Sequence, residues 1–160
     1  MGTAASSSSA QLTARDFRLA VLVSRYNEDI VSALLDGARA AWRARGGDPA
    51  ALRVRHVPGA FELPLAARAF ALGGGVDAVV ALGCVIRGET AHFELVAGEC
   101  ARGLQRIMLD TGVPVSFGVL TVDTREQALA RAGDGAANKG FEALETALAM
   151  ASLLRQLKSG

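Results

Sequence analysis

Residues 77–86 read DAVVALGCVI, a run of ten residues in which only Asp77 is charged. An apolar stretch with no polar alternation is typical of a strand that is covered on both faces, as strands of parallel sheets are. Three glycines, at positions 73–75, end the segment before it. We therefore predict a buried strand here, with helices on both sides of its sheet.

On either side of this run, segments with the apolar spacing of strands alternate with segments that have the apolar spacing of helices. Short apolar or alternating stretches predict further strands over residues 18–24, 52–57 and 113–122. Apolar residues at three- and four-residue steps predict helices over residues 30–42, 63–70, 91–110, 125–131 and 141–157, with a loop over 133–139. Strands that alternate with helices predict an α/β fold: a three-layer αβα sandwich around a four-stranded parallel sheet with right-handed crossovers.

Length and composition indicate one domain. The chain has 160 residues, of which 51% are hydrophobic but only 5% aromatic, so Ala, Val and Leu must fill the core. Residues 1–10 are mostly Ser and Ala, without a basic segment before an apolar one, so they do not resemble a signal peptide. We expect a flexible N-terminal arm over residues 1–14 and a single domain over residues 15–160.

Charge and cysteine usage exclude several classes of function. The formal net charge is +1, which gives no concentrated positive field for nucleic acid. No run of about 18 apolar residues is long enough to span a membrane. The two cysteines, Cys84 and Cys100, have neither CxxC nor metal-ligand spacing. We expect buried thiols in a cytoplasmic protein, with no metal.

The unusual residues cluster just after the predicted strands, where parallel sheets bind ligands. The segments are Arg25-Tyr26-Asn27 after the first strand, Pro58 to Glu62 after the second and Arg87 to His92 after the third. The fourth strand carries Phe117 and leads on to Arg131 and Lys139.

Each of these residues has a structural and a functional interpretation. Tyr26 either packs against a helix or stacks on a flat heterocycle. Glu62 either favours a helix dipole or binds sugar hydroxyls. His92 is either structural or a proton shuttle beside an anion held at the helix start, at Gly88-Glu89-Thr90.

Arg131 and Lys139 are either solvated cations or a second clamp on a phosphate. We take His56, inside a strand, as structural. Taken together, the residues indicate a small phosphorylated substrate, a flat ring and acid–base chemistry without a metal.

In their order and spacing, six segments of the chain resemble the lumazine synthase family between about Arg18 and Leu154. They are SRYN (24–27), VPGAFELP (57–64), LGCVIRGETAHFE (82–94), VPVSFGVLT (113–121), EQALARAG (126–133) and NKG (138–140). The resemblance implies a flavodoxin-like sheet and a transferase of riboflavin biosynthesis. It would join 5-amino-6-(D-ribitylamino)uracil to 3,4-dihydroxy-2-butanone 4-phosphate, giving 6,7-dimethyl-8-ribityllumazine and phosphate without a cofactor.

The resemblance also implies roles for single residues. His92 would be the catalytic proton shuttle. Glu62 would accept hydrogen bonds from the ribityl chain, and Arg131 would bind phosphate together with Gly88, Glu89 and Thr90. The remaining residues expected to bind ribitylaminouracil are Tyr26, Asn27, Ala60, Phe61, Cys84, Val85, Ile86, Phe117 and Lys139.

Two of these positions depart from the usual family residues. Tyr26 stands where Phe or Trp is usual, which keeps an aromatic face. Cys84 stands where Thr is common, so a backbone contact would survive and a hydroxyl contact would not.

Members of this family form pentamers in which Phe117 would close the pocket of a neighbouring subunit, and some assemble further into icosahedral shells. The GDGAAN loop (133–138) is as short as in shell-forming members but differs from their usual GTKAGN. We therefore expect a homopentamer and leave the shell open.

Three other functions are possible but less favoured by the sequence, since the RGETAHFE segment is intact and Glu62, His92 and Arg131 are all present. An archaeal type of riboflavin synthase resembles this fold but would use the lumazine product twice. A non-catalytic member would bind flavin or lumazine only. A flavodoxin-like FMN carrier would need a Ser/Thr-rich phosphate loop after the first strand, where this chain has Arg25-Tyr26-Asn27.

Overall fold

A computed structural model describes residues 11–160, so most of the expected N-terminal arm, residues 1–10, lies outside the described part. The strands are β1 (Leu19–Ser24), β2 (Leu52–Val57), β3 (Ala78–Ile86) and β4 (Val115–Val122). The α-helices are α1 (Glu28–Ala44), α2 (Leu63–Gly73), α3 (His92–Thr111), α4 (Arg125–Arg131) and α5 (Lys139–Ser159). Two short 3-10 helices, η1 (Pro49–Ala51) and η2 (Ala60–Glu62), were not expected from the sequence.

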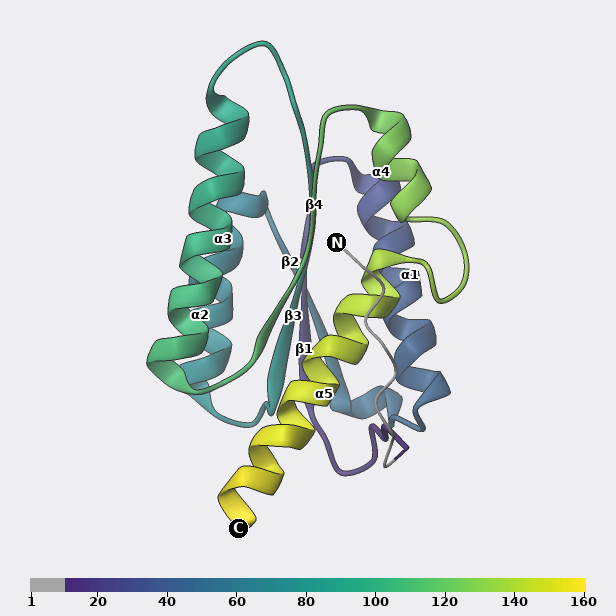
Figure 1. Cartoon of the computed structure of the whole chain (residues 1–160), viewed down its shortest axis with the longest axis vertical. Helices are drawn as coiled ribbons and strands as arrows, with labels where there is room; N and C mark the ends of the chain where they lie inside the picture. The colour runs from purple at the N-terminus through teal and green to yellow at the C-terminus, as the bar shows by residue number, and fades with distance from the viewer. Residues whose placement is uncertain (1–10) are drawn as a thin grey trace.

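The four strands form one parallel sheet in the order β2-β1-β3-β4, which confirms the predicted fold class. In Figure 1 helices α2 and α3 cover one face of the sheet, while α1, α4 and α5 cover the other. All six residues of β1 are buried, as expected for a strand with neighbours on both sides and helices on both faces. Strands β2 and β4 are the two edges.

The side chains of the central strands divide between two cores. On β3, Val80 and Leu82 pack with α1 and α5, whereas Val79 and Ala81 pack with α2 and α3. The period of two along a strand sends alternate side chains to opposite faces. Ala14, within the expected arm, is buried in the first of these cores, and its N–H donates to the carbonyl of Arg45.

Helix α5 begins at Lys139, two residues before the predicted start, because Asn138 caps it. The Asn138 Oδ1 atom accepts hydrogen bonds from the backbone N–H groups of Gly140 (2.8 Å) and Phe141 (3.2 Å). Helix α5 then packs closely along α1, where a Cβ added at Gly140 would lie only 1.9 Å from the carbonyl oxygen of Leu34. Within residues 11–160 no helix is long and apolar enough to cross a membrane.

Candidate functional site

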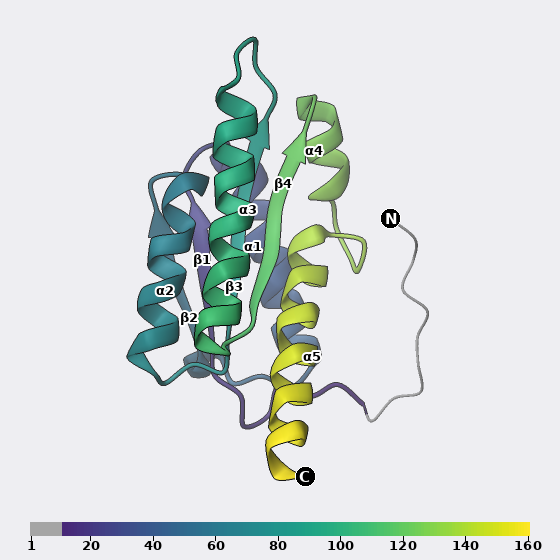
Figure 2. The same cartoon turned by 60° about the vertical axis from the view of Figure 1, so that its left-hand side comes forward.

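A cleft of about 640 Å³ lies where β1, β2 and β3 end, beside the start of α3. Figure 2 shows the loop that leads from the end of β3 into the start of α3. Its walls are Tyr26, Asn27, Gly59, Ala60, Phe61, Glu62, Cys84, Val85, Ile86, His92, Leu95 and Val96. The structure therefore brings together nine of the residues singled out from the sequence: Tyr26, Asn27, Ala60, Phe61, Glu62, Cys84, Val85, Ile86 and His92. They come from three separate strand ends, because parallel strands gather their carboxyl ends at one edge of the sheet.

The Tyr26 ring and the Glu62 carboxylate meet over Gly59. A Cβ added at Gly59 would lie 3.1 Å from both Tyr26 Cδ2 and Glu62 Oε2. The ring itself is 72% exposed, so it presents an aromatic surface rather than filling a core. Glu62 makes no side-chain cap bond to α2, which leaves its carboxylate available to a polar ligand. A flat ring with attached hydroxyl groups fits this pair of side chains.

Asn27 fixes the loop that carries Tyr26. Its backbone is left-handed (φ 56°), a conformation that asparagine tolerates better than most residues. Its side-chain Nδ2 donates to the carbonyl oxygen of Cys84 at 3.0 Å, across 57 residues of sequence. This bond joins the end of β1 to the end of β3, where the two strands no longer pair directly.

The Cys84 side chain is closed to solvent. Its exposed fraction is 3%, and burial raises the pKa of the thiol to about 11. A thiol with such a pKa stays protonated near neutral pH, which disfavours Cys84 as a nucleophile. What this segment offers to a ligand is its strand-end backbone and the half-buried side chains of Val85 and Ile86.

His92 is the first residue of α3 and is exposed in the cleft. Its backbone N–H donates to Thr90 Oγ1 at 3.3 Å. The expected phosphate segment, Gly88 to Thr90, is exposed and leads directly into this helix of 20 residues. Backbone N–H groups at the start of a long helix favour an anion, so an anion bound here would lie beside the His92 imidazole.

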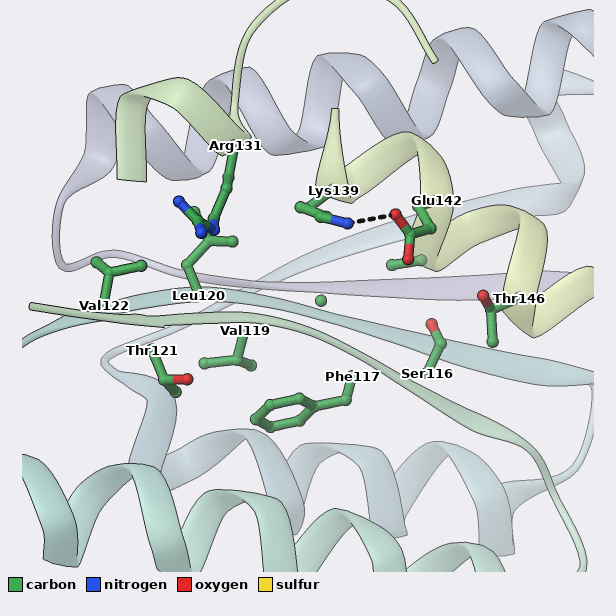
Figure 3. Close-up of a pocket in the computed structure, with 12 residues that line it drawn as sticks. Ser116, Phe117, Val119, Leu120, Thr121, Val122, Arg131, Lys139, Glu142 and Thr146 are labelled. Carbon is green, nitrogen blue, oxygen red and sulfur yellow. Dashed lines mark hydrogen bonds and ion pairs between the residues drawn. The ribbon is translucent and has the colours of Figure 1, made fainter. Parts of the chain in front are cut away.

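The other three residues singled out, Phe117, Arg131 and Lys139, lie elsewhere. They line a groove of about 310 Å³ along the edge strand β4 (Figure 3), and this groove shares no residue with the cleft. Phe117 is 45% exposed and projects on the α3 side of β4, while Arg131 and Lys139 lie on the α5 side. Arg131 therefore lines this groove and not the cleft that holds His92.

Both cations of the groove are held by their own helices. Lys139 Nζ pairs with Glu142 Oε2 at 2.6 Å, and Arg131 Nη1 donates to the carbonyl oxygen of Gln127 at 2.9 Å. Both remain on the surface of the groove, which Ser116 and Thr146 also line. The groove thus offers two cations and hydroxyl groups beside an exposed aromatic ring.

A buried amide positions both sides of this groove. Asn138 is 3% exposed, and its Nδ2 donates to the carbonyl oxygens of Ala33 (3.1 Å), Ala132 (3.1 Å) and Gly133 (2.9 Å). These bonds connect α1, the segment after α4 and the start of α5. Asn138 therefore sets where Arg131 and Lys139 stand relative to each other.

Sequence reasoning missed several residues of the site. Leu95 and Val96 line the cleft at three and four residues after His92, and this helical period was the signal that could have found them. Gly59 lies in the segment Pro58 to Glu62 but was not singled out as a site residue. The role of Asn138 had no local signal beyond that of a helix cap, because its partners lie on three different segments. Among residues 11–160 no group of His, Cys, Asp and Glu side chains has the arrangement of a metal site.

Comparison with known proteins shows the family of the chain. The family model of 6,7-dimethyl-8-ribityllumazine synthase matches residues 16–155. A 6,7-dimethyl-8-ribityllumazine synthase of Thermus thermophilus is 55% identical over 146 residues, which cover 91% of this chain and 93% of that protein. Enzymes of the same name from Syntrophus aciditrophicus (50% identity, 92% and 96% covered) and Chlorobium limicola (48% identity, 91% and 94% covered) are also similar. The chain therefore belongs to the 6,7-dimethyl-8-ribityllumazine synthase family.

Proposed function

We propose that this chain performs the lumazine synthase reaction in the cleft beside His92, and that the groove of a second copy completes each site. The reaction joins 5-amino-6-(D-ribitylamino)uracil to 3,4-dihydroxy-2-butanone 4-phosphate and releases phosphate. The observation that carries the proposal is the separation of the site residues. The cleft holds Tyr26, Glu62 and His92, whereas Phe117, Arg131 and Lys139 line a groove with no residue in common with it.

The surface around the groove supports a second copy as the missing part. Strand β4 is an edge of the sheet, and apolar side chains with large exposed fractions lie near it, including Phe117 and Met150. An uncovered edge with exposed apolar groups is a surface that soluble proteins usually cover. Because the cleft and the groove are different surfaces, contact between them is head-to-tail, and a head-to-tail contact that closes forms a ring. We propose that this ring is a homopentamer, as the family resemblance implies.

In this proposal the pyrimidine ring stacks on Tyr26, and the ribityl hydroxyl groups donate to Glu62. Backbone groups of Cys84 to Ile86 hold the edge of the ring. The Asn27 amide is already bonded to Cys84, so we assign it to holding this backbone as well as to lining the cleft. From the second copy, Phe117 closes the cleft and Lys139 adds positive charge near the ring.

The phosphate of the butanone is received by N–H groups of Gly88, Glu89 and Thr90, with the guanidinium of Arg131 from the second copy. His92, next to this segment, moves protons as the ring amine attacks the ketone to form an imine and water, phosphate leaves, and the second ring closes with loss of a second water. Such proton transfer contributes about 10²–10⁴-fold, and holding two reactants together contributes much of the rest. We also propose a cytoplasmic location, which the two free and buried thiols support.

Complementation between two inactive variants tests the shared site. His92→Ala damages the cleft and Arg131→Ala damages the groove. Co-expression of the two, with different tags for purification of mixed oligomers, should restore activity, because some sites then combine an intact cleft with an intact groove. In a ring with random order about a quarter of the sites are intact. The assay is the absorbance of the lumazine product against the uncatalysed background.

The control is a mixture of the two purified homo-oligomers without subunit exchange, which should remain inactive. Mixed oligomers without any recovery would show that each chain carries its whole site. A folded wild-type oligomer that binds ribitylaminouracil but forms no product would instead favour a binding function.

A further inference from the structure

The arginine directly after β3 is the centre of an interaction network that the reaction described above does not use. Arg87 Nε donates to Asp123 Oδ1 at 2.8 Å, and its Nη1 pairs with Glu94. Its guanidinium carbon lies 4.2 Å from the centre of the Phe93 ring. Its backbone N–H donates to the carbonyl oxygen of Val122 at 2.9 Å. One side chain therefore joins the ends of β3 and β4 to the first turn of α3.

These contacts engage two of the three nitrogens of the Arg87 guanidinium and one of its faces. Two carboxylates take donors from the fork of the guanidinium, and Phe93 covers one of its faces. The pairing with both carboxylates also raises the pKa of Arg87, so its charge is constant. The positive charge of Arg87 is therefore paired with carboxylates of its own chain rather than with a ligand.

The location of the network shows what it holds in place. Arg87 and Glu94 stand on either side of the segment Gly88 to Thr90, so their ion pair closes a short loop around it. Asp123 anchors the pair from β4, and its own backbone N–H donates to Gln127 Oε1 at 2.8 Å, at the start of α4. The loop is thereby fixed to the sheet at the point where the N–H groups of the segment emerge.

Stability is a poor explanation for these contacts. The side chains of Arg87, Glu94 and Asp123 are 44%, 54% and 66% exposed. Exposed ion pairs contribute little to folding, because solvent screens them and ordering long side chains costs entropy. Variants of these residues should therefore fold, and their effects on the reaction can be measured.

We propose that Arg87 is a positioning residue: through Glu94 and Asp123 it holds the segment Gly88–Thr90 in the orientation that receives the phosphate of the butanone substrate. The inference rests on the proposed function, because it needs the phosphate to bind at this segment. Its consequence is selective, since the ribitylaminouracil side of the cleft is built by other strand ends.

Glu94→Gln gives the sharpest test, because positioning and simple electrostatics predict opposite signs. The substitution weakens the ion pair between Glu94 and Arg87. If Arg87 is a positioning residue, KM for the butanone phosphate should rise roughly tenfold, because a small displacement of a binding group weakens binding. Removing a negative charge close to an anion site would by itself lower that KM. The KM for ribitylaminouracil and the kcat at saturation should change by less than about twofold.

Three further variants complete the design. Arg87→Lys keeps the charge but lacks the fork, so it should show the same selective rise in KM. Asp123→Asn removes the charge of the second carboxylate, and it replaces Glu94→Gln as the test variant if Glu94→Gln does not fold. Glu99→Gln is the matched control: it makes the same change of charge on the same helix, but Glu99 pairs with Arg102 and is outside the network. It should leave both KM values unchanged.

Inorganic phosphate separates failure of this inference from failure of the proposed function. In the wild type, phosphate should inhibit competitively with the butanone phosphate and more weakly in Glu94→Gln. Absence of competition in the wild type would overturn the phosphate site itself, and the positioning role with it. Normal competition in the wild type, with an unchanged or lower KM in Glu94→Gln or wild-type behaviour of Arg87→Lys, would overturn the positioning role alone.

Discussion

Replacing Gly140 with alanine is expected to destabilise the protein, although alanine is the better helix former. Gly140 lies in the first turn of α5, where that helix touches the backbone of α1. A Cβ at this position would lie 1.9 Å from the carbonyl oxygen and 2.8 Å from the Cα of Leu34. Both contacts are with backbone, so no side chain can turn away to make room.

The magnitude follows from two opposing effects. Ordinary contact begins at 3.4 Å, so the two helices must separate by about 1.5 Å at this point. Overpacking of this kind costs about 3 kcal/mol at the upper end of its usual range. Helix propensity returns about 1 kcal/mol for Gly to Ala. The net loss of about 2 kcal/mol corresponds to a fall in Tm of roughly 4–8 °C for a chain of this size.

Thermal unfolding followed by circular dichroism measures this change. The protein concentration must be the same for all samples, because association stabilises the folded chain. Gly73→Ala is the matched control, since Gly73 is the last residue of α2 and a Cβ there meets nothing within 4 Å. Its Tm should not fall. A Tm for Gly140→Ala at or above that of the wild type would refute the close contact between α1 and α5.

Three further outcomes are expected. His92→Ala should lower kcat by about 10²–10⁴-fold with little change in KM for ribitylaminouracil; steady-state kinetics that show equal losses for both substrates would contradict a proton-transfer role. Asn27→Asp removes the donor to the Cys84 carbonyl, so KM for ribitylaminouracil should rise about fivefold while that for the butanone phosphate does not, in the same assay. Burial raises the pKa of Cys84 and Cys100 to about 11, above the 9.0 of a free thiol, so folding favours the protonated form. The stability that this provides is complete below about pH 9 and is lost as the pH rises to about 11; Tm should fall over that range, and less steeply in Cys100→Ala.

Much of the local structure was predictable because it depends on neighbouring residues. The alternation of LRVRHV predicted β2 with the bounds found, Leu52–Val57, and residues 125–131 form the predicted helix α4. The unbroken apolar run at residues 77–86 predicted a strand buried on both faces, and β3 (Ala78–Ile86) lies between β1 and β4 with a core on each side. Hydrophobic period and turn residues contain this information within a few positions.

The cleft was also predictable in part. Strand-end residues of a parallel sheet gather at one edge whatever the strand order, so Tyr26, Glu62 and His92 were expected together before any coordinates. The family resemblance, rather than this argument, placed Arg131 with the phosphate segment; in one chain Arg131 lines the groove along β4 and not the cleft. Arg131 follows the edge strand β4 by way of α4, so its position depends on how α4 and α5 pack rather than on where a strand ends.

The sequence by itself determined the kinds of elements, their order and the chemical character of each strand end. Only the tertiary structure decided the strand order β2-β1-β3-β4, the pairing of Arg87 with Glu94 and Asp123, and the contacts of Asn138 with three segments. Local signals fix backbone conformation within a turn or a strand. Which cation meets which carboxylate, and which glycine lies under another helix, depends on packing between residues that are far apart in sequence, and no short-range pattern encodes it.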